Sequence, residues 1–184
     1  MPTQIFKKLI SDTDETAIDV LALESGLPKM RIKDAMSKGA VWLKHGSKTK
    51  RLRRSTQKLG KGDEISLYYN AEVLALAPPS LELLADEKQY SVWIKPPGLL
   101  AQGTQEGDHC SLLRAAELLL KREVFLVHRL DREAAGLMLI AHTPKAAAAF
   151  SALFARQQAD AGIRKFYCVN VKGKIAEQGE IALP

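Results

Sequence analysis

Apolar residues in segment 14–39 recur at three- and four-residue spacing, which predicts two short helices. Gly26 can close the first helix in the left-handed conformation, and Pro28 fits the first turn of the second. Beyond them, β-branched and aromatic residues predict strands at 41–43 and 64–69, each beside a glycine-containing turn. The first part of the chain is therefore expected to form a small helix–helix–strand unit.

A linker rich in alanine and proline follows, with Ala77-Pro78-Pro79-Ser80 as its clearest marker. The boundary is placed near residues 70 to 80, which gives two expected domains, 1–75 and 76–184. In the second domain the hydrophobic pattern predicts strands at 89–94, 123–127, 136–141 and 164–173 and helices at 111–122 and from Pro144 onward. The predicted fold class is α+β, with a mixed or antiparallel sheet in the second domain.

A polar segment separates two of these predicted strands. Between the apolar runs 123–127 and 136–141, four polar or charged residues occupy five positions, namely His128, Arg129, Asp131 and Arg132. A carboxylate between core strands is costly to bury unless it is paired or used. The spacing alone leaves two interpretations open: a turn whose charged side chains lie in solvent, or an active site.

The net charge of +6 is concentrated in the first part of the chain. Residues 1–70 contain 14 Lys and Arg against 8 Asp and Glu, whereas residues 71–184 contain 13 of each. Between Lys29 and Lys61, 12 basic residues accompany a single acid, Asp34. Such a one-sign block attracts a polyanion through phosphate contacts and counterion release. Nucleic acid is the expected partner; a membrane surface and a merely solubilising face are the alternatives.

Composition narrows the class of protein further. The hydrophobic fraction of 46% is that of an ordinary globular chain, and no apolar run approaches the ~18 residues of a membrane span. The N-terminus lacks signal-peptide features, and only Cys110 and Cys168 are present, so a reducing, cytoplasmic location and no membrane partner are expected. The histidines and cysteines show no paired ligand spacing, and no glycine-rich phosphate loop is found. No metal or cofactor is therefore expected.

Three segments of the second domain resemble motifs of RluA-type RNA pseudouridine synthases. His128-Arg129-Leu130-Asp131, followed by Gly136-Leu137-Met138-Leu139, is similar to the central signature of that family, HRLD, a variable pair, Thr-Ser or similar, and Gly-Leu-Leu. Ala134 and Ala135 depart from it where small hydroxyl residues are usual. Segment 95–100, Lys-Pro-Pro-Gly-Leu-Leu, resembles the first motif of the family, and segment 164–173 resembles its Lys-x-Tyr-x-Ala-x-Val-x-Gly strand.

The resemblance implies residue roles in pseudouridine formation, in which uracil leaves its ribose, turns and rejoins through carbon 5. Asp131 would be the catalytic carboxylate, which is ionised at neutral pH without an activating base. Tyr167 would stack on the base and assist proton transfer, and Arg129 would help hold a flipped-out uridine. His128 is expected to be structural. The reaction needs no metal or redox cofactor.

The first domain resembles an S4-type RNA-binding module, with matching pieces at 18–21, 31–36, 38–41 and 58–65. Its RNA-facing residues would lie on the second helix and the following loop, and they are Lys29, Arg31, Lys33 and Lys38. Similar enzymes with such a module act on the large ribosomal RNA. Ribosomal RNA is therefore the expected substrate, in preference to transfer RNA.

Family members continue past Pro184 and supply a Gly-Arg-x-His-Gln-Leu/Ile-Arg segment, whose arginine pairs with the catalytic carboxylate. The chain is accordingly expected to hold an incomplete catalytic domain, as a fragment or a truncated product. Two function classes remain open. The first is an RNA-modifying isomerase, whole or truncated, and the second is a non-catalytic RNA-binding protein with a decayed enzyme domain.

Overall fold

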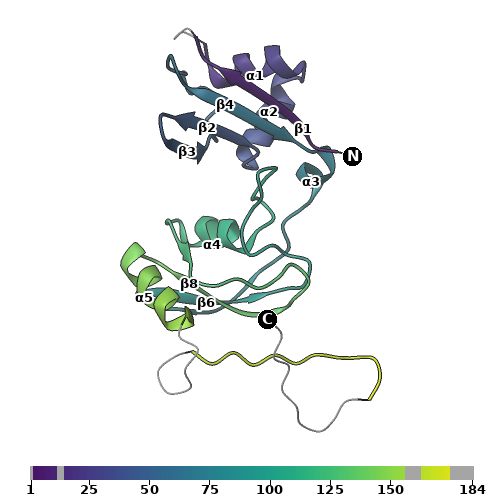
Figure 1. Cartoon of the computed structure of the whole chain (residues 1–184), viewed down its shortest axis with the longest axis vertical. Helices are drawn as coiled ribbons and strands as arrows, with labels where there is room; N and C mark the ends of the chain where they lie inside the picture. The colour runs from purple at the N-terminus through teal and green to yellow at the C-terminus, as the bar shows by residue number, and fades with distance from the viewer. Residues whose placement is uncertain (1, 12–14, 156–162, 175–184) are drawn as a thin grey trace.

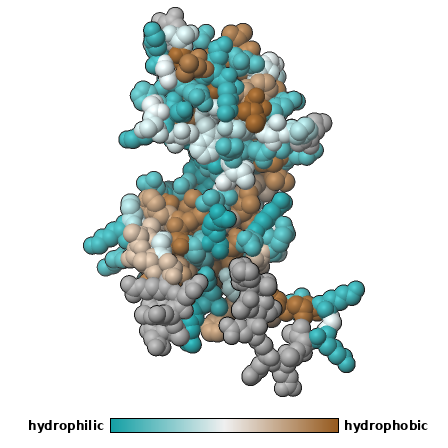
Figure 2. Space-filling model, in the orientation of Figure 1, coloured by the Kyte–Doolittle hydropathy of each residue, from teal (hydrophilic) through white to brown (hydrophobic). Residues whose placement is uncertain are grey.

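The computed structural model describes residues 2–11, 15–155 and 163–174. Two four-stranded sheets follow one another along its longest axis, each with its own helices (Figure 1). The space-filling view shows the corresponding two lobes joined by a narrower waist (Figure 2). We refer to the part containing the first sheet as the first unit and to the part containing the second sheet as the second unit.

The first unit is an antiparallel sheet in the order β1-β4-β2-β3. Its strands are β1 (Gln4–Leu9), β2 (Val41–His45), β3 (Lys48–Arg51) and β4 (Glu64–Tyr69). Helices α1 (Ala17–Ser25) and α2 (Lys29–Ser37) cover one face, where their apolar side chains and those of β2 and β4 form one buried cluster. The predicted helices and the two central strands are confirmed.

The two edge strands of this sheet, β1 and β3, were not predicted. Both are largely exposed, and β3 consists of Lys-Thr-Lys-Arg, without apolar alternation. Their conformation comes from pairing with β4 and β2, whose sequences do carry a strand signal. Gly26 closes α1 at φ 69°, as expected, with its N–H donating to the Ala22 carbonyl at 3.0 Å.

Between the sheets, the chain forms the short helix α3 (Ala71–Ala75) and then residues 76–81 without regular structure. The Asn70 side chain caps α3 by accepting from the N–H groups of Glu72 and Val73. Neither α3 nor the following strand was predicted, because their apolar residues lie inside an alanine- and proline-rich stretch.

The second unit is an antiparallel sheet in the order β5-β6-β8-β7. Its strands are β5 (Glu82–Asp86), β6 (Tyr90–Lys95), β7 (Phe125–Leu126) and β8 (Gly136–Ala141). Helix α4 (Leu112–Leu120) packs on the face that carries Trp93 and Met138, and α5 (Pro144–Ala155) contributes Phe150 to the opposite face. The predicted strand at 123–127 is thus reduced to the two residues of β7.

The strand predicted at 164–173 is wrong. Residues 163–174 have no regular secondary structure, and Phe166 and Tyr167 are 84% and 63% exposed. In Figure 1 this yellow segment runs below the second sheet, apart from it. Alternating apolar residues form a strand only where a neighbouring strand completes the hydrogen-bond ladder, and no described strand pairs with this segment.

Candidate active site

The polar segment forms the turn between β7 and β8, residues 127–135. Within this turn, the Asp131 carbonyl accepts a hydrogen bond from the Ala134 N–H at 3.2 Å. The side chains of Arg129 and Asp131 are exposed. Within the described residues, neither side chain takes part in a hydrogen bond or ion pair. The turn therefore presents a carboxylate and a guanidinium that are both available to a ligand.

A buried lysine holds this turn in place through hydrogen bonds to backbone carbonyl groups. Lys95, the last residue of β6, is fully buried, and its Nζ donates to the carbonyl oxygens of Pro96, Leu99 and Arg132 at 3.0, 2.7 and 3.0 Å. Gly98 adds two bonds, because its N–H donates to the Arg132 carbonyl at 2.8 Å and its own carbonyl accepts from Arg132 Nε at 3.2 Å. The motif at 95–100 and the turn that carries Asp131 are thus tied into one rigid structure.

The electrostatics of the site follow from this burial. Desolvation lowers the pKa of Lys95, while the carboxylates of Glu133 and Asp131 oppose that shift. The Asp131 carboxylate lies in solvent, on a turn whose backbone is bonded to a buried amine. A carboxylate held in this way can act as a nucleophile or stabilise positive charge on a substrate.

Sequence reasoning did not identify Lys95 as a site residue. The structure adds that the first residue of the Lys-Pro-Pro-Gly segment holds the turn at 127–135 through the Arg132 carbonyl. The available signal was the period of β6, because Ser91, Trp93 and Lys95 alternate onto the same buried face. A lysine at a core position of a strand indicates a polar role for its amine.

His128 has a structural contact, in agreement with the role expected for it. Its Nε2 accepts from the Leu139 N–H at 3.0 Å, and its ring stacks on Phe154 with centroids 4.2 Å apart. Burial lowers the pKa of His128, and the positive charge of Lys165 lowers it further. The imidazole is thus neutral and holds the turn to β8.

This contact predicts a pH dependence of stability. Because the pKa of His128 is lower in the folded chain, the unfolded chain takes up its proton first as the pH falls. The stabilisation is present above the unfolded pKa of about 6.5 and is lost as the pH falls toward the folded pKa. In His128→Gln, whose amide oxygen can accept from Leu139, the melting temperature should fall less between about pH 7.5 and about pH 5. Identical pH profiles in thermal unfolding would contradict this assignment.

The structure does not bring Tyr167 into the site. Tyr167 makes no hydrogen bond or ring contact with any described residue, and it is exposed on segment 163–174. The start of that segment does reach the flank of the turn, because Lys165 Nζ lies 6.0 Å from the centroid of the Phe154 ring that stacks on His128.

The four basic residues predicted to face RNA are in two different situations. Arg31 and Lys33 are exposed on α2, and within the described part of the chain neither side chain is hydrogen-bonded or ion-paired. Lys29 pairs with Asp19 at 2.5 Å. Lys38 pairs with Asp34 at 2.9 Å and donates to the Leu74 carbonyl at 2.7 Å, which ties the end of α2 to α3.

Two classes of feature are not found in the described residues. They contain no group of three or more His, Cys, Asp or Glu side chains placed to hold a metal ion. None of their helices is both long and apolar enough to cross a membrane.

Comparison with known proteins relates the second unit to one enzyme family. The RNA pseudouridylate synthase family matches residues 89–184. The tRNA pseudouridine synthase C of Haemophilus ducreyi is 32% identical over 107 residues, 56% of this chain and 42% of that protein. An RNA pseudouridine synthase of Mycoplasma pneumoniae, the MG209 homolog, is 40% identical over 62 residues, 33% of this chain and 20% of that protein. The chain therefore spans less than half the length of these relatives.

A structural comparison gives a weaker likeness. One solved pseudouridylate synthase matches 68% of this chain and 47% of its own, with 18% identity and a TM-score of 0.25.

Proposed function

Because the chain belongs to the RNA pseudouridylate synthase family, we propose that it isomerises uridines in RNA and that Asp131 is its catalytic carboxylate. The observation that carries this proposal is the position of Asp131, exposed on a turn that the buried Lys95 amine fixes through the Arg132 carbonyl. An exposed acid on an ordinary surface loop would have no need of such support. A preorganised first shell held by a second shell is typical of catalytic groups.

The proposed chemistry takes place at the ribose–uracil bond. Asp131 supplies a nucleophile or a negative charge beside that bond, while the base detaches, turns and rejoins through carbon 5. A uridine in structured RNA must first leave its stack, at a cost of a few kcal/mol. Arg129, exposed two residues before Asp131, can hold the flipped nucleotide by stacking or by donating to its phosphate. Tyr167 is proposed to assist the proton transfer, with segment 163–174 folded against the turn.

We assign the chain to the RluA-type branch on three motif segments, 95–100, 128–139 and 164–173. The first two are brought together by the bonds of Lys95 and Gly98 to Arg132. Both motifs lie at the paired ends of β6 and β8, where Lys95 faces Gly136, and this shared position supports the assignment.

The proposed substrate is large-subunit ribosomal RNA, on the likeness of the first unit to an S4-type module. Pseudouridine mapping of ribosomal and transfer RNA from cells lacking the gene tests this choice. Loss of particular ribosomal pseudouridines is expected. Loss confined to transfer RNA would contradict the substrate. An unchanged map of both would favour the non-catalytic RNA-binding alternative.

The exposed cations of α2 should carry part of the RNA affinity. In the double variant Arg31→Gln, Lys33→Gln, RNA affinity is expected to fall roughly tenfold, and the log–log salt slope should shrink by about 1.5, as two phosphate contacts are lost. The matched control is the double variant Lys88→Gln, Lys145→Gln, which removes two exposed lysines of the second unit. Binding titrations at several salt concentrations measure both quantities. Equal affinity of all three proteins would rule out this face.

A further inference from the structure

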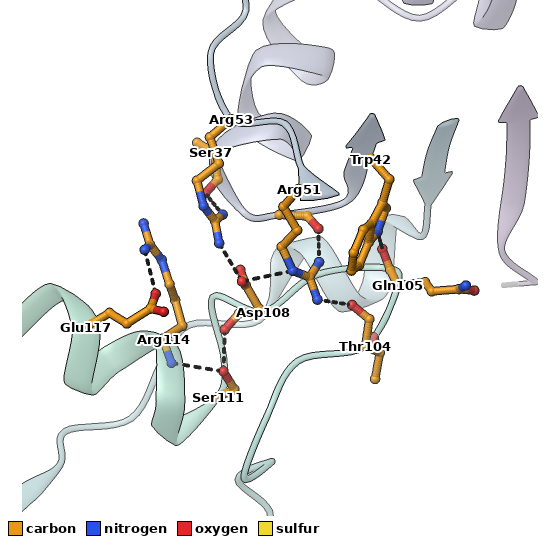
Figure 3. Close-up of polar contacts among 11 residues, drawn as sticks. Ser37, Trp42, Arg51, Arg53, Thr104, Gln105, Asp108, Ser111, Arg114 and Glu117 are labelled. Carbon is orange, nitrogen blue, oxygen red and sulfur yellow. Dashed lines mark hydrogen bonds and ion pairs between the residues drawn. The ribbon is translucent and has the colours of Figure 1, made fainter. Parts of the chain in front are cut away.

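Two arginines of segment 29–61, which we call the basic stretch, point away from solvent and toward the second unit. Arg51, at the end of β3, and Arg53 both form ion pairs with Asp108, the former at 3.1 Å between Nε and Oδ2 (Figure 3). The side chains of Arg51, Arg53 and Asp108 are only 18, 27 and 11% exposed. Asp108 lies in residues 101–110, which connect the motif at 95–100 to α4 and which we call the docking loop.

Further hydrogen bonds join the docking loop to the first unit. The Asp108 N–H donates to the Lys38 carbonyl at 2.9 Å, and Trp42 Nε1 donates to the Gln105 carbonyl at 3.0 Å. The Arg51 guanidinium also donates to the Thr104 carbonyl at 2.6 Å and lies over the Trp42 ring, 4.3 Å from its centroid (Figure 3). The contact thus combines charge, backbone bonds and an aromatic surface.

The fit at this contact is close. Gly39 has φ 84°, and a Cβ added there would collide with the Asp108 carboxylate. Gly107 approaches the Lys38 carbonyl, which would lie 3.1 Å from an added Cβ. Desolvation lowers the pKa of Arg51, and Asp108 opposes that shift. If the two arginines bound RNA phosphates instead, Asp108 would remain a largely buried carboxylate without a cation, which is strongly destabilising.

The docking loop is also continuous with the support of Asp131. It begins directly after Leu99 and Leu100, and the Leu99 carbonyl is one of the three acceptors of Lys95. At its other end the Ser111 hydroxyl donates to the Asp108 carbonyl at 2.8 Å and caps α4 by accepting from the Arg114 N–H (Figure 3). Both ends of the docking loop are therefore held within the second unit, so that the first unit packs against a part of the second unit with its own supports.

We propose that Asp108, held by Arg51 and Arg53, is a positioning and specificity-determining residue. Asp108 fixes the exposed cations of α2 at one distance and angle from Asp131. When these cations bind one element of the RNA, only a uridine at that same distance from the bound element reaches the Asp131 carboxylate. The basic stretch accordingly has two functions. Arg31 and Lys33 face RNA, and Arg51 and Arg53 orient the first unit relative to the second. The specificity role rests on the proposed function, whereas the orientation of the two units does not.

The orientation is tested by distances between spin labels on the full chain. Labels are attached at Leu23→Cys on α1 and Ala148→Cys on α5, both exposed, after Cys110 and Cys168 are replaced by Ser. The parent should give one narrow distance distribution, which Asp108→Ala should broaden.

Two further variants complete the distance measurement. Arg53→Gln should also broaden the distribution, because it weakens the same ion pair from the other side. The matched control is Asp86→Ala, which removes an ion pair to Arg122 within the second unit and should leave the distribution narrow. Narrow distributions in both Asp108→Ala and Arg53→Gln, with native melting, would overturn the proposal.

The specificity role is tested with two RNAs that contain the same target uridine, one structured and one a short unstructured oligonucleotide. Asp108→Ala should lower kcat/KM roughly tenfold or more on the structured RNA, since small misplacements are costly, and change it little on the oligonucleotide. Equal losses on both RNAs would contradict a specificity role. If the complete protein modifies neither RNA, the proposed function is wrong, and the label distances still decide the role of Asp108 in orientation.

Discussion

Replacing Asp131 by Asn is expected to lower pseudouridine formation by the complete protein at least about 10³-fold. The amide has the same shape as the carboxylate but carries neither its charge nor its nucleophilicity. The Asp131 side chain makes no hydrogen bond within the described residues, so the melting temperature and the RNA affinity should change little. Single-turnover assays with chromatographic quantification of pseudouridine measure the rate, and thermal unfolding checks the fold.

The matched control for this variant is Glu123→Gln, which removes an exposed acid just before β7. It alters the net charge by the same amount in the same unit and should retain the parent rate. A comparable loss in Glu123→Gln would show that charge in general, rather than the Asp131 carboxylate, governs the reaction.

Replacing Lys95 by Met is expected to lower the free energy of unfolding by about 3 kcal/mol, at about 1 kcal/mol for each hydrogen bond that its three carbonyl acceptors lose. Those acceptors are Pro96, Leu99 and Arg132, and the burial of the amine excludes water as a substitute. The turn that carries Asp131 should loosen at the same time, and the reaction should slow.

Denaturant titration of Lys95→Met measures this loss. Lys145→Met, at an exposed position in the first turn of α5, provides the control and should be close to neutral. Unchanged stability of Lys95→Met would mean that the three carbonyls find other partners. The proposed tie between the two motifs would then be wrong.

The elements found from the sequence are those whose own residues determine their conformation. Helix α2 buries Ile32, Ala35 and Met36 at helical spacing, and β4 carries a continuous apolar signal. The edge strands β1 and β3 escaped prediction because their partners impose the pairing. The opposite error occurred at 164–173, where the local pattern favours a strand but no described strand lies beside it.

The candidate site shows the same division between local and distant information. The turn containing Asp131 could be located from its polar residues between two apolar runs. The role of Lys95 depends on the Arg132 carbonyl, 37 positions away, and that of Arg51 on Asp108, across a still longer separation. A count of charges treats all 12 basic residues between Lys29 and Lys61 alike, whereas the fold assigns two of them to a contact with the second unit.

The most direct test of the central claim, that the turn at Asp131 is a uridine-isomerising site, is tritium release from RNA labelled at carbon 5 of uridine. The complete protein and its Asp131→Asn variant are measured in parallel on the same RNA. Release by the complete protein and none above background by the variant is the predicted result. Equal release from both would contradict the assignment of Asp131.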